Sequence, residues 1–214
     1  MRLMKACVAV LPVAGAGMSL FTAISRVPIG SSDDHAGNAE RLQFTLGQGP
    51  CLEAHETGQP VLADQRLIAE RWPEYHQRLT DNTPFRAVAA FPLPGAFADF
   101  ATLDLFHRDS DLGRLPHADI VGVTRQISLA LIQDQLGLQP DQLPRWLETP
   151  GARNRNTVFV AIGILNVALG LTPPNALAVL RAHAYSTDRS VDDIAQDVVL
   201  RRMPTSELRV EGNL

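Results

Sequence analysis

The 214-residue chain is 45% hydrophobic and 20% charged, an ordinary balance for a globular protein and a length that allows one full domain and a smaller one. No apolar run approaches the roughly 20 residues of a membrane helix, and the apolar start breaks at Pro12, which argues against a signal peptide. We therefore expect a cytoplasmic protein with no membrane association. The two cysteines, Cys7 and Cys51, are too few for a disulfide framework or a four-ligand zinc site.

The net charge of −4 is unevenly distributed along the chain. Residues 151–214 carry seven arginines and six acidic residues, whereas residues 1–150 carry twelve basic and seventeen acidic residues. The excess of positive charge in the C-terminal part is slight, so charge alone does not indicate a nucleic-acid partner.

The first part of the chain alternates short apolar stretches with polar turns, which is typical of a mixed α and β domain. Strands are predicted at residues 15–24, 61–64, 87–93 and 101–107, and helices at residues 35–42, from Pro50 onward, and at residues 71–81. Pro50 suits the first position of a helix, where its missing N–H would have no partner. The last two strands are joined by a hairpin at residues 94–97, so we expect an α+β fold.

Residues 117–136 differ from this pattern, because apolar side chains recur at helical spacing over the whole stretch. The stripe comprises Ile120, Val121, Val123, Ile127, Ala130, Leu131 and Leu136. It is longer than closing one small domain requires. We therefore expect the helix both to close the first domain and to pair with a second copy of the chain, through Ile127 and Leu131 in particular.

The domain organisation follows from these elements. Residues 1–136 are predicted to be the first domain with its connecting helix, and residues 137–155 form a linker rich in proline and glycine. Residues 156–203 are predicted to be a helical module, and residues 204–214 a tail.

The helical module shows clear helix start and stop signals. A first helix is predicted from about residue 158 to residue 169, before Gly170. The second begins with Thr172 as its cap, and the third follows Ser190. Three short helices have a thin core by themselves, so docking or dimerisation is expected.

The first domain resembles the GAF domains of actinobacterial GAF–ANTAR proteins. The resemblance rests on the segments 15–20 (GAGMSL), 41–54 (RLQFTLGQGPCLEA), 58–61 (GQPV) and 71–73 (RWP). It implies a sensor domain, an antiparallel sheet with flanking helices, that receives a small molecule or a protein partner.

The helical module resembles an ANTAR domain. The resemblance rests on the order and spacing of the segments 161–165 (AIGIL), 169–172 (LGLT), 176–184 (ALAVLRAHA) and 191–195 (VDDIA). It implies an all-α three-helix module that binds a hairpin RNA in a nascent transcript and prevents termination, in a protein that acts as a dimer. The residues expected to form the motif and its packing are Ala161, Gly163, Leu165, Ala176, Leu180, Ala184, Ile194 and Ala195. Gly163 is expected to let another helix come close, because glycine costs up to about 1 kcal/mol inside a helix.

The candidate RNA-binding side chains are basic residues on the second and third helices and at their ends. They are Arg181, His183, Arg189, Arg201 and Arg202. If the second helix turns Leu180 inward, Arg181 lies at the edge of that face and is expected to reach outward beside the end of the third helix. Arginine suits this role because its planar fork binds phosphate at two points and stacks on loop bases.

An alternative function is a dimeric protein-interaction regulator whose helical module no longer binds RNA. Phe159 and Val160 are apolar, and residues 158–203 carry four arginines and four aspartates, a net charge of zero. Because RNA affinity depends largely on neutralising phosphates, salt-dependent binding to hairpin RNA distinguishes the two functions.

Cys51 is predicted at the second position of its helix, where free N–H groups lower the pKa of a thiol, and His55 follows four residues later on the same face. The functional interpretation is a sensor thiol or half of a metal site. The structural interpretation, which we favour, is a small buried cysteine at a tight turn beside an unrelated surface histidine.

No catalytic arrangement is recognisable. The sequence has no nucleophile elbow, no phosphate-binding loop with Gly-Lys-Ser/Thr and no His-Glu-x-x-His. We therefore expect a protein that is not an enzyme and that holds no metal and no cofactor.

Overall fold

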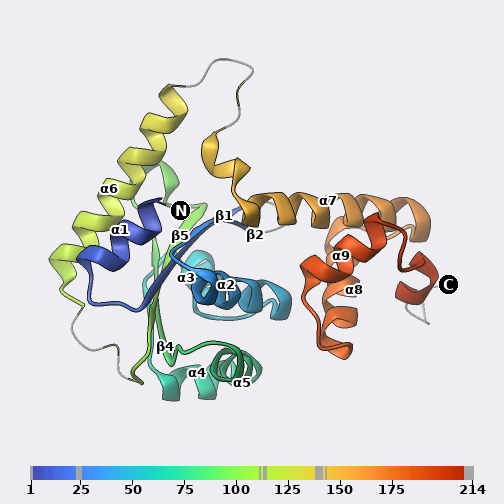
Figure 1. The fold of residues 1–214 in the computed structure, drawn as a ribbon, viewed down its shortest axis with the longest axis horizontal. Coiled ribbons are helices and arrows are strands. Elements are labelled where there is room, and N and C mark those ends of the chain that lie inside the picture. The colour runs from blue at the N-terminus through green and yellow to red at the C-terminus, as the bar shows by residue number, and fades with distance from the viewer. Residues whose placement is uncertain are drawn as a thin grey trace.

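A computed structural model describes residues 2–22, 26–110, 112, 115–137, 142 and 144–209 (Figure 1). We call residues 2–137 the sheet domain and residues 150–208 the helical module. The strands are β1 (Gly15–Phe21), β2 (Arg26–Ser31), β3 (Val61–Ala63), β4 (Ala87–Pro92) and β5 (Ala101–His107). The helices of the sheet domain are α1 (Arg2–Val10), α2 (Asp34–Leu46), α3 (Pro50–Thr57), α4 (Gln65–Arg71), α5 (Pro73–Asn82) and α6 (His117–Leu136). The helical module contains α7 (Pro150–Leu169), α8 (Pro173–Ser186) and α9 (Val191–Val199).

The strands form one antiparallel five-stranded sheet in the order β2-β1-β5-β4-β3. Side chains alternate between its two faces. Along β5, Leu103 and Leu105 point to one face, whereas Thr102, Asp104 and Phe106 point to the other. The two faces therefore carry different chemistry.

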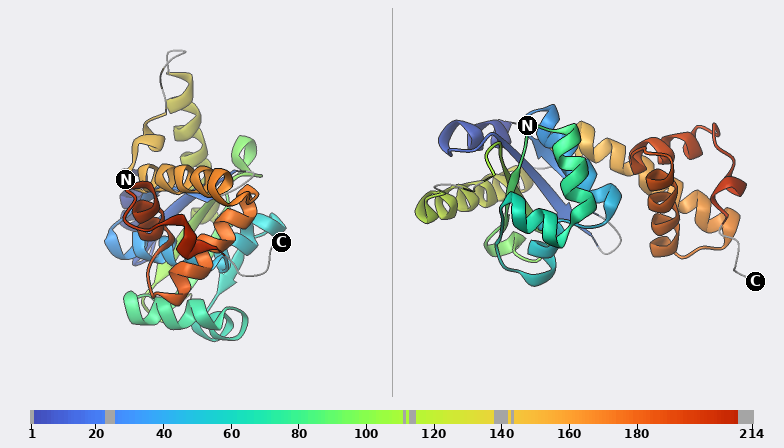
Figure 2. Two further views of the ribbon diagram at one scale, coloured as in Figure 1. Left: turned by 90° about the vertical axis from the view of Figure 1, so that its right-hand side faces the viewer. Right: turned by 90° about the horizontal axis from the view of Figure 1, so that it is seen from below.

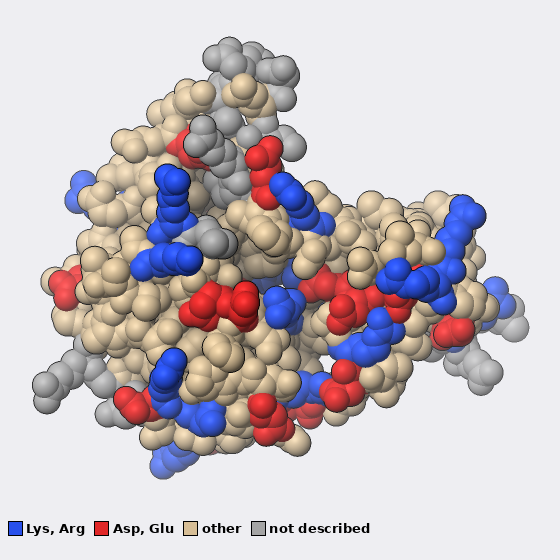
Figure 3. All heavy atoms as spheres, viewed as in Figure 1, with Lys and Arg blue, Asp and Glu red and all other residues tan. Residues whose placement is uncertain are grey.

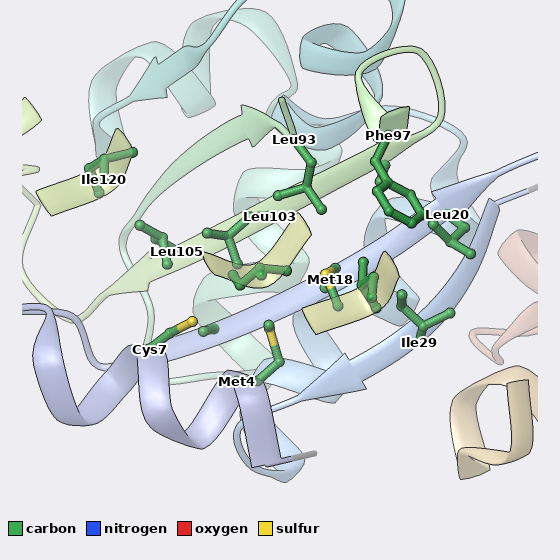
Figure 4. Packing of buried hydrophobic residues seen from close by; sticks show 14 of the residues in the cluster. Met4, Cys7, Met18, Leu20, Ile29, Leu93, Phe97, Leu103, Leu105 and Ile120 are labelled. Atoms are coloured by element: carbon green, nitrogen blue, oxygen red, sulfur yellow. The ribbon is translucent and has the colours of Figure 1, made fainter. Parts of the chain in front are cut away.

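Helices α1 and α6 cover the first face, and the layer between them and the sheet is apolar (Figure 4). Met4 and Cys7 from α1 meet Met18 and Ile29 from β1 and β2, and all four are at most 3% exposed. This apolar packing is the main hydrophobic core of the sheet domain.

Helices α2, α3, α4 and α5 cover the second face. Apolar side chains such as Ile68, Leu79 and Phe85 fill most of this layer. Beneath α2, however, the sheet contributes Ser19 and Asp104, which are both fully buried. This polar region is a candidate site.

The helical module is a three-helix bundle beside the β2 edge of the sheet (Figures 1 and 2). Helix α8 begins with Thr172 as its cap, and α9 begins with a capping box between Ser190 and Asp193. Both starts confirm the predicted ones. Among the described residues, no single helix is long and apolar enough to cross a membrane, and α7 and α8 qualify only together, as a pair bent by 106°.

Several predicted bounds were wrong. Helix α7 begins at Pro150, with Thr149 as its cap, so it starts about two turns before the predicted position and within the predicted linker. The helix predicted at 71–81 corresponds to α5, which begins two residues later at Pro73, and the preceding helix α4 was not predicted. Strand β2 was not predicted. The predicted strand 15–24 is described only to Thr22, and its end at Ile24 lies outside the described residues.

Helix α6 confirms the predicted range, but the predicted role of Ile127 and Leu131 was wrong. Both side chains are 2% exposed and pack against the sheet, so neither is available to a second copy. The apolar side chains of α6 that face solvent are Val121, Leu129 and Leu136.

The core of the helical module predicts a sharp contrast between two positions on α7. Leu165 is fully buried, whereas Val167 is 85% exposed. Leu165→Ala is expected to lower the free energy of unfolding by about 2–5 kcal/mol, because it leaves a cavity. Val167→Ala is expected to change it by less than about 0.5 kcal/mol. Urea unfolding followed by circular dichroism measures both, and equal effects would contradict this packing.

Candidate functional site

A group of charged side chains is buried between α2 and the sheet, and we call Arg26, Glu40 and Asp104 the charge cluster. Their side chains are at most 4% exposed. Arg26 forms ion pairs with Glu40 and, at 3.2 Å, with Asp104. Ser19 donates to Glu40 at 2.9 Å, and Gln43 donates to Asp104 at 2.9 Å. Two carboxyl groups therefore share one buried cation.

The second oxygens of the two carboxyl groups face no donor. Among the described residues, Glu40 Oε1 and Asp104 Oδ1 have no hydrogen-bond partner. A proton on Glu40 would supply the missing donor and would balance the buried charge. Burial and the neighbouring Asp104 raise the pKa of Glu40 to about 8 against the opposing effect of Arg26. Burial therefore favours the protonated form of Glu40, against the attraction of Arg26.

Tyr75 and Cys51 complete the surroundings of the charge cluster. Both side chains are fully buried, and burial raises the pKa of each well above its usual range. The Cys51 sulfur lies 2.8 Å from Thr102 Oγ1. The lowered thiol pKa of the functional interpretation was therefore wrong, because desolvation outweighs the helix N-terminus.

His55 does not share a partner with Cys51. Its ring stacks on Phe21 with the ring centroids 3.7 Å apart, and burial lowers its pKa. Among the residues that the structure describes, no three histidine, cysteine, aspartate or glutamate side chains are grouped so that they could hold a metal ion.

Helix α2 positions the functional side chains of the sheet domain. Asp33 caps its start by accepting from Ala36 N–H, and Gly47 ends it in the left-handed conformation. Glu40 and Gln43 lie three residues apart, on the face that looks toward the sheet. Phe44 follows directly, but its ring belongs to the core of the helical module. One helix therefore contacts both the charge cluster and the neighbouring module.

Arg181 does not reach outward as predicted. It is largely buried, and its Nε donates to the carbonyl oxygen of Phe44 at 3.0 Å. That carbonyl lies in the last turn of α2, where a cation is favoured by the helix dipole. The prediction failed because it considered the module alone and not the sheet domain against which α8 packs.

The other candidate RNA-binding residues lie at or near the ends of α8 and α9. Arg189 and Arg202 both pair with Asp197, at 2.6 Å each. Arg201 is exposed and lies just after α9 in the left-handed conformation, with φ of 56°. His183 is half-buried on α8. Four candidates therefore lie near the helix ends, whereas Arg181 faces the sheet domain.

Seven of the eight predicted motif residues are fully buried in the bundle, and Gly163 is the exception. Apart from its chain neighbours and the backbone of its own helix, no heavy atom of the described residues lies within 4 Å of a Cβ placed on Gly163. The predicted close approach of another helix at this residue was therefore wrong for the described chain, because this part of α7 faces solvent.

The junction between the two modules is built around the ring of Phe44. The Arg155 guanidinium lies over the ring at 3.1 Å from its centroid, and that of Arg181 lies 5.1 Å from it. Arg155 is 1% exposed, and its nearest counter-ion is Asp192, at 3.5 Å. Burial lowers the pKa of Arg155. A desolvated cation–π contact of this kind contributes about 2 kcal/mol or more.

Polar contacts extend the junction beyond the ring of Phe44. Thr45 Oγ1 accepts from the Val191 N–H at 3.3 Å, so α2 supplies a partner for the first N–H of α9. Arg78 of α5 pairs with Asp188. Between these contacts lies a polar cleft of about 750 Å³, lined by side chains of both signs. Figure 3 shows acidic and basic side chains next to one another across this junction.

Sequence reasoning missed the charge cluster and Phe44. The members of the charge cluster lie between 14 and 78 residues apart, so no local motif joins them. One signal was present, since Asp104 is a single carboxylate inside an otherwise apolar strand. Phe44 gave no signal, because its partners belong to another module.

Comparison with known proteins identifies the helical module. Residues 152–199 match the family model of the ANTAR domain. ANTAR domains are RNA-binding modules of transcription antitermination, which supports a general regulatory role for the chain. No curated protein sequence matches the chain.

One solved structure similar to this chain is a domain assigned to a two-component sensor histidine kinase protein from Sinorhizobium meliloti 1021. It is 14% identical, with a TM-score of 0.46, and the match covers 62% of this chain and 87% of that chain.

The raised pKa of Glu40 predicts a specific pH dependence of stability. The pKa is about 8 in the folded protein, above the usual value near 4.5. The stabilisation by the bound proton is therefore complete below about pH 4.5 and is lost progressively as the pH rises from there to about 8. The free energy of unfolding is expected to fall by a few kcal/mol between about pH 5 and pH 8 and then to level off, since each pH unit between the two pKa values is worth at most about 1.4 kcal/mol.

Glu40→Gln is the matched control for this prediction. The amide keeps the shape of the side chain but cannot ionise, so most of this loss should disappear. Urea unfolding at several pH values measures the difference between the two proteins. An identical pH dependence in both would show that Glu40 is not the group responsible.

Proposed function

We propose that the protein is a signal-responsive transcription antiterminator. In this proposal the sheet domain is a GAF-type sensor, and the ANTAR domain binds a hairpin in a nascent RNA. The main observation in support of this proposal is that the ANTAR domain at residues 152–199 packs directly on a domain with a buried, titratable charge cluster. The protein would act in the cytoplasm, and the proposal assigns it no catalytic step.

The charge cluster supports the sensing role. A buried cation shared by two carboxyl groups, with unpartnered oxygens among the described residues, is costly unless something compensates for it. Such a site responds to a proton, or to a small polar ligand that supplies the missing hydrogen bonds. Either event would change the forces on α2, which is in contact with the ANTAR domain.

Arg201 offers the clearest test of RNA binding, because it is exposed and outside the junction. The wild type is expected to bind a pool of hairpin RNAs with an affinity that falls as salt increases. Arg201→Ala should weaken binding and reduce the salt slope by about 0.7–0.9, the effect of one lost phosphate contact. Filter binding across a salt series measures this effect.

Arg66→Ala is the matched control for charge. Arg66 is also exposed but lies on α4 of the sheet domain. Its loss should leave the salt slope unchanged. Equal effects of the two variants would mean that RNA contacts the chain only non-specifically, and no binding by the wild type at low salt would remove the proposed function.

One observation favours a second candidate function, a regulator that acts through protein contacts. Arg155 and Arg181 face Phe44, while Arg189 and Arg202 share Asp197, so four arginines of this region are engaged within the chain. This regulator would bind a protein partner instead of RNA, and the hairpin pool would detect no complex.

We also propose that the protein is a homodimer through α6. Val121 and Leu129 are 50% and 42% exposed, and they line an apolar groove of about 660 Å³ beside β3 and β4. A large exposed apolar patch on a domain commonly marks an interface. Leu129→Glu is expected to give a monomer by light scattering, with an unchanged circular dichroism spectrum. A dimer that persists in Leu129→Glu would place the interface elsewhere.

A further inference from the structure

We infer that helix α2 is a latch that holds the ANTAR domain closed against the sheet domain, and that the charge on Glu40 controls this latch. The inference deepens the proposed function, on which its RNA readout rests. We call Phe44, Thr45 and Gly47 the distal end of the latch, because they contact the ANTAR domain. Glu40 and Gln43 are its root, because they contact the charge cluster.

The distal end binds Arg181, which is one of the candidate RNA-binding side chains of the ANTAR domain. The Nε of Arg181 already donates to the Phe44 carbonyl, and its guanidinium packs over Gly47. A guanidinium that is bound in this way and largely buried has lost much of its capacity for two-point phosphate binding. The closed arrangement therefore masks Arg181 from RNA.

The root of the latch is fixed by the charge cluster. Glu40 lies one helical turn before Phe44, about 6 Å along the axis. The backbone carbonyl of Glu40 accepts from Arg26 at 3.1 Å, so Arg26 binds both the main chain and the side chain at this residue. Gln43 lies near the end of α2 and donates to Asp104. It also accepts a hydrogen bond from the backbone N–H of Cys51. A change at the root therefore moves the helix that carries Phe44.

The groups that face Glu40 determine whether its ionisation favours the closed or the open arrangement. They are Arg26 from β2, Asp104 from β5, Tyr75 from α5, Cys51 from α3 and Ser19 from β1, with Arg155 of α7 further away. Tyr75 and Cys51 remain neutral, so ionisation of Glu40 leaves a buried excess of one negative charge.

This excess charge favours the open arrangement. If α2 shifts, water reaches Glu40 and its pKa returns toward the ordinary value. The closed arrangement therefore binds the proton more tightly, and a rise in pH shifts the population toward the open one. The population of the open arrangement therefore increases with pH up to about 8, the pKa of Glu40 in the closed arrangement.

The first experiment tests the distal end by a distance between the two modules. Spin labels are attached through Glu70→Cys on α4 and Asn175→Cys on α8, since both positions are exposed and the native Cys7 and Cys51 are buried. Labelled protein is diluted with unlabelled protein so that distances within one chain dominate. Phe44→Ala is expected to add a population with a longer distance and to raise the affinity for the hairpin RNA pool about tenfold, because it removes the aromatic half of the contact.

Two further variants keep this test decisive. Phe100→Ala removes an exposed aromatic ring of the sheet domain and should change neither the distance nor the affinity. Arg155→Met keeps most of the side-chain volume but removes the cation, and it replaces Phe44→Ala if that variant does not fold. Unchanged distances in Phe44→Ala and Arg155→Met would overturn the latch.

The RNA readout separates failure of the latch from failure of the proposed function. Longer distances with tighter RNA binding support both. Longer distances with no RNA binding by any variant support a mechanical latch and overturn RNA binding by this chain. Longer distances with weaker RNA binding overturn the masking of Arg181, because Phe44 would then be preparing the RNA surface.

The second experiment tests the root with the same labels. The longer distance should become more populated in the wild type as the pH rises from about 6 to about 8, because opening allows Glu40 to ionise. Glu40→Gln should remain closed over this range. An equal pH response in both proteins would overturn the control by Glu40. The distances in Phe44→Ala would still decide whether the distal end holds the two modules together.

Discussion

One contact that joins the two modules is made by the ring of Phe44, which lies against the guanidinium groups of Arg155 and Arg181. The ring belongs by sequence to the sheet domain, but by packing it belongs to the core of the ANTAR domain. The face of an aromatic ring attracts cations, and this attraction strengthens when water is excluded. The three-helix bundle, whose own core is thin, thus gains a large apolar side chain from its neighbour.

The charge cluster sets the position of the helix that presents Phe44. A buried ion pair usually stabilises a protein less than apolar packing of the same volume, because removing the charges from water is costly. Its directional hydrogen bonds, however, specify one position, whereas apolar contacts tolerate small shifts. Arg26 binds Glu40 through both its side chain and its carbonyl, so the rotation and the depth of α2 are both defined.

Much of the fold could be predicted from local sequence signals, and the errors have physical reasons. The caps at Thr172 and Ser190 act within one turn, so the starts of α8 and α9 were readable. Strand β2 contains Pro28 and Gly30, which read as a loop, but an edge strand tolerates proline.

The candidate site was harder to predict than the fold. The orientation of Arg181 depends on α2, which lies more than a hundred residues earlier in the chain. The charge cluster likewise joins three separate elements. Helical periodicity indicates which face of an element is buried, but not which neighbour covers it.

Gly47 meets two unrelated requirements. Its φ of 67° is the left-handed conformation that ends α2, and a Cβ placed there would lie 3.0 Å from the Arg181 guanidinium. Because glycine has no side chain, Gly47 can both end α2 in the left-handed conformation and leave room for an arginine of the other module. If a different output domain is fused to this sheet domain, the turn at Gly47 therefore remains part of the contact surface between the two. The incoming domain would have to offer a flat, cationic side chain to a surface already shaped for one.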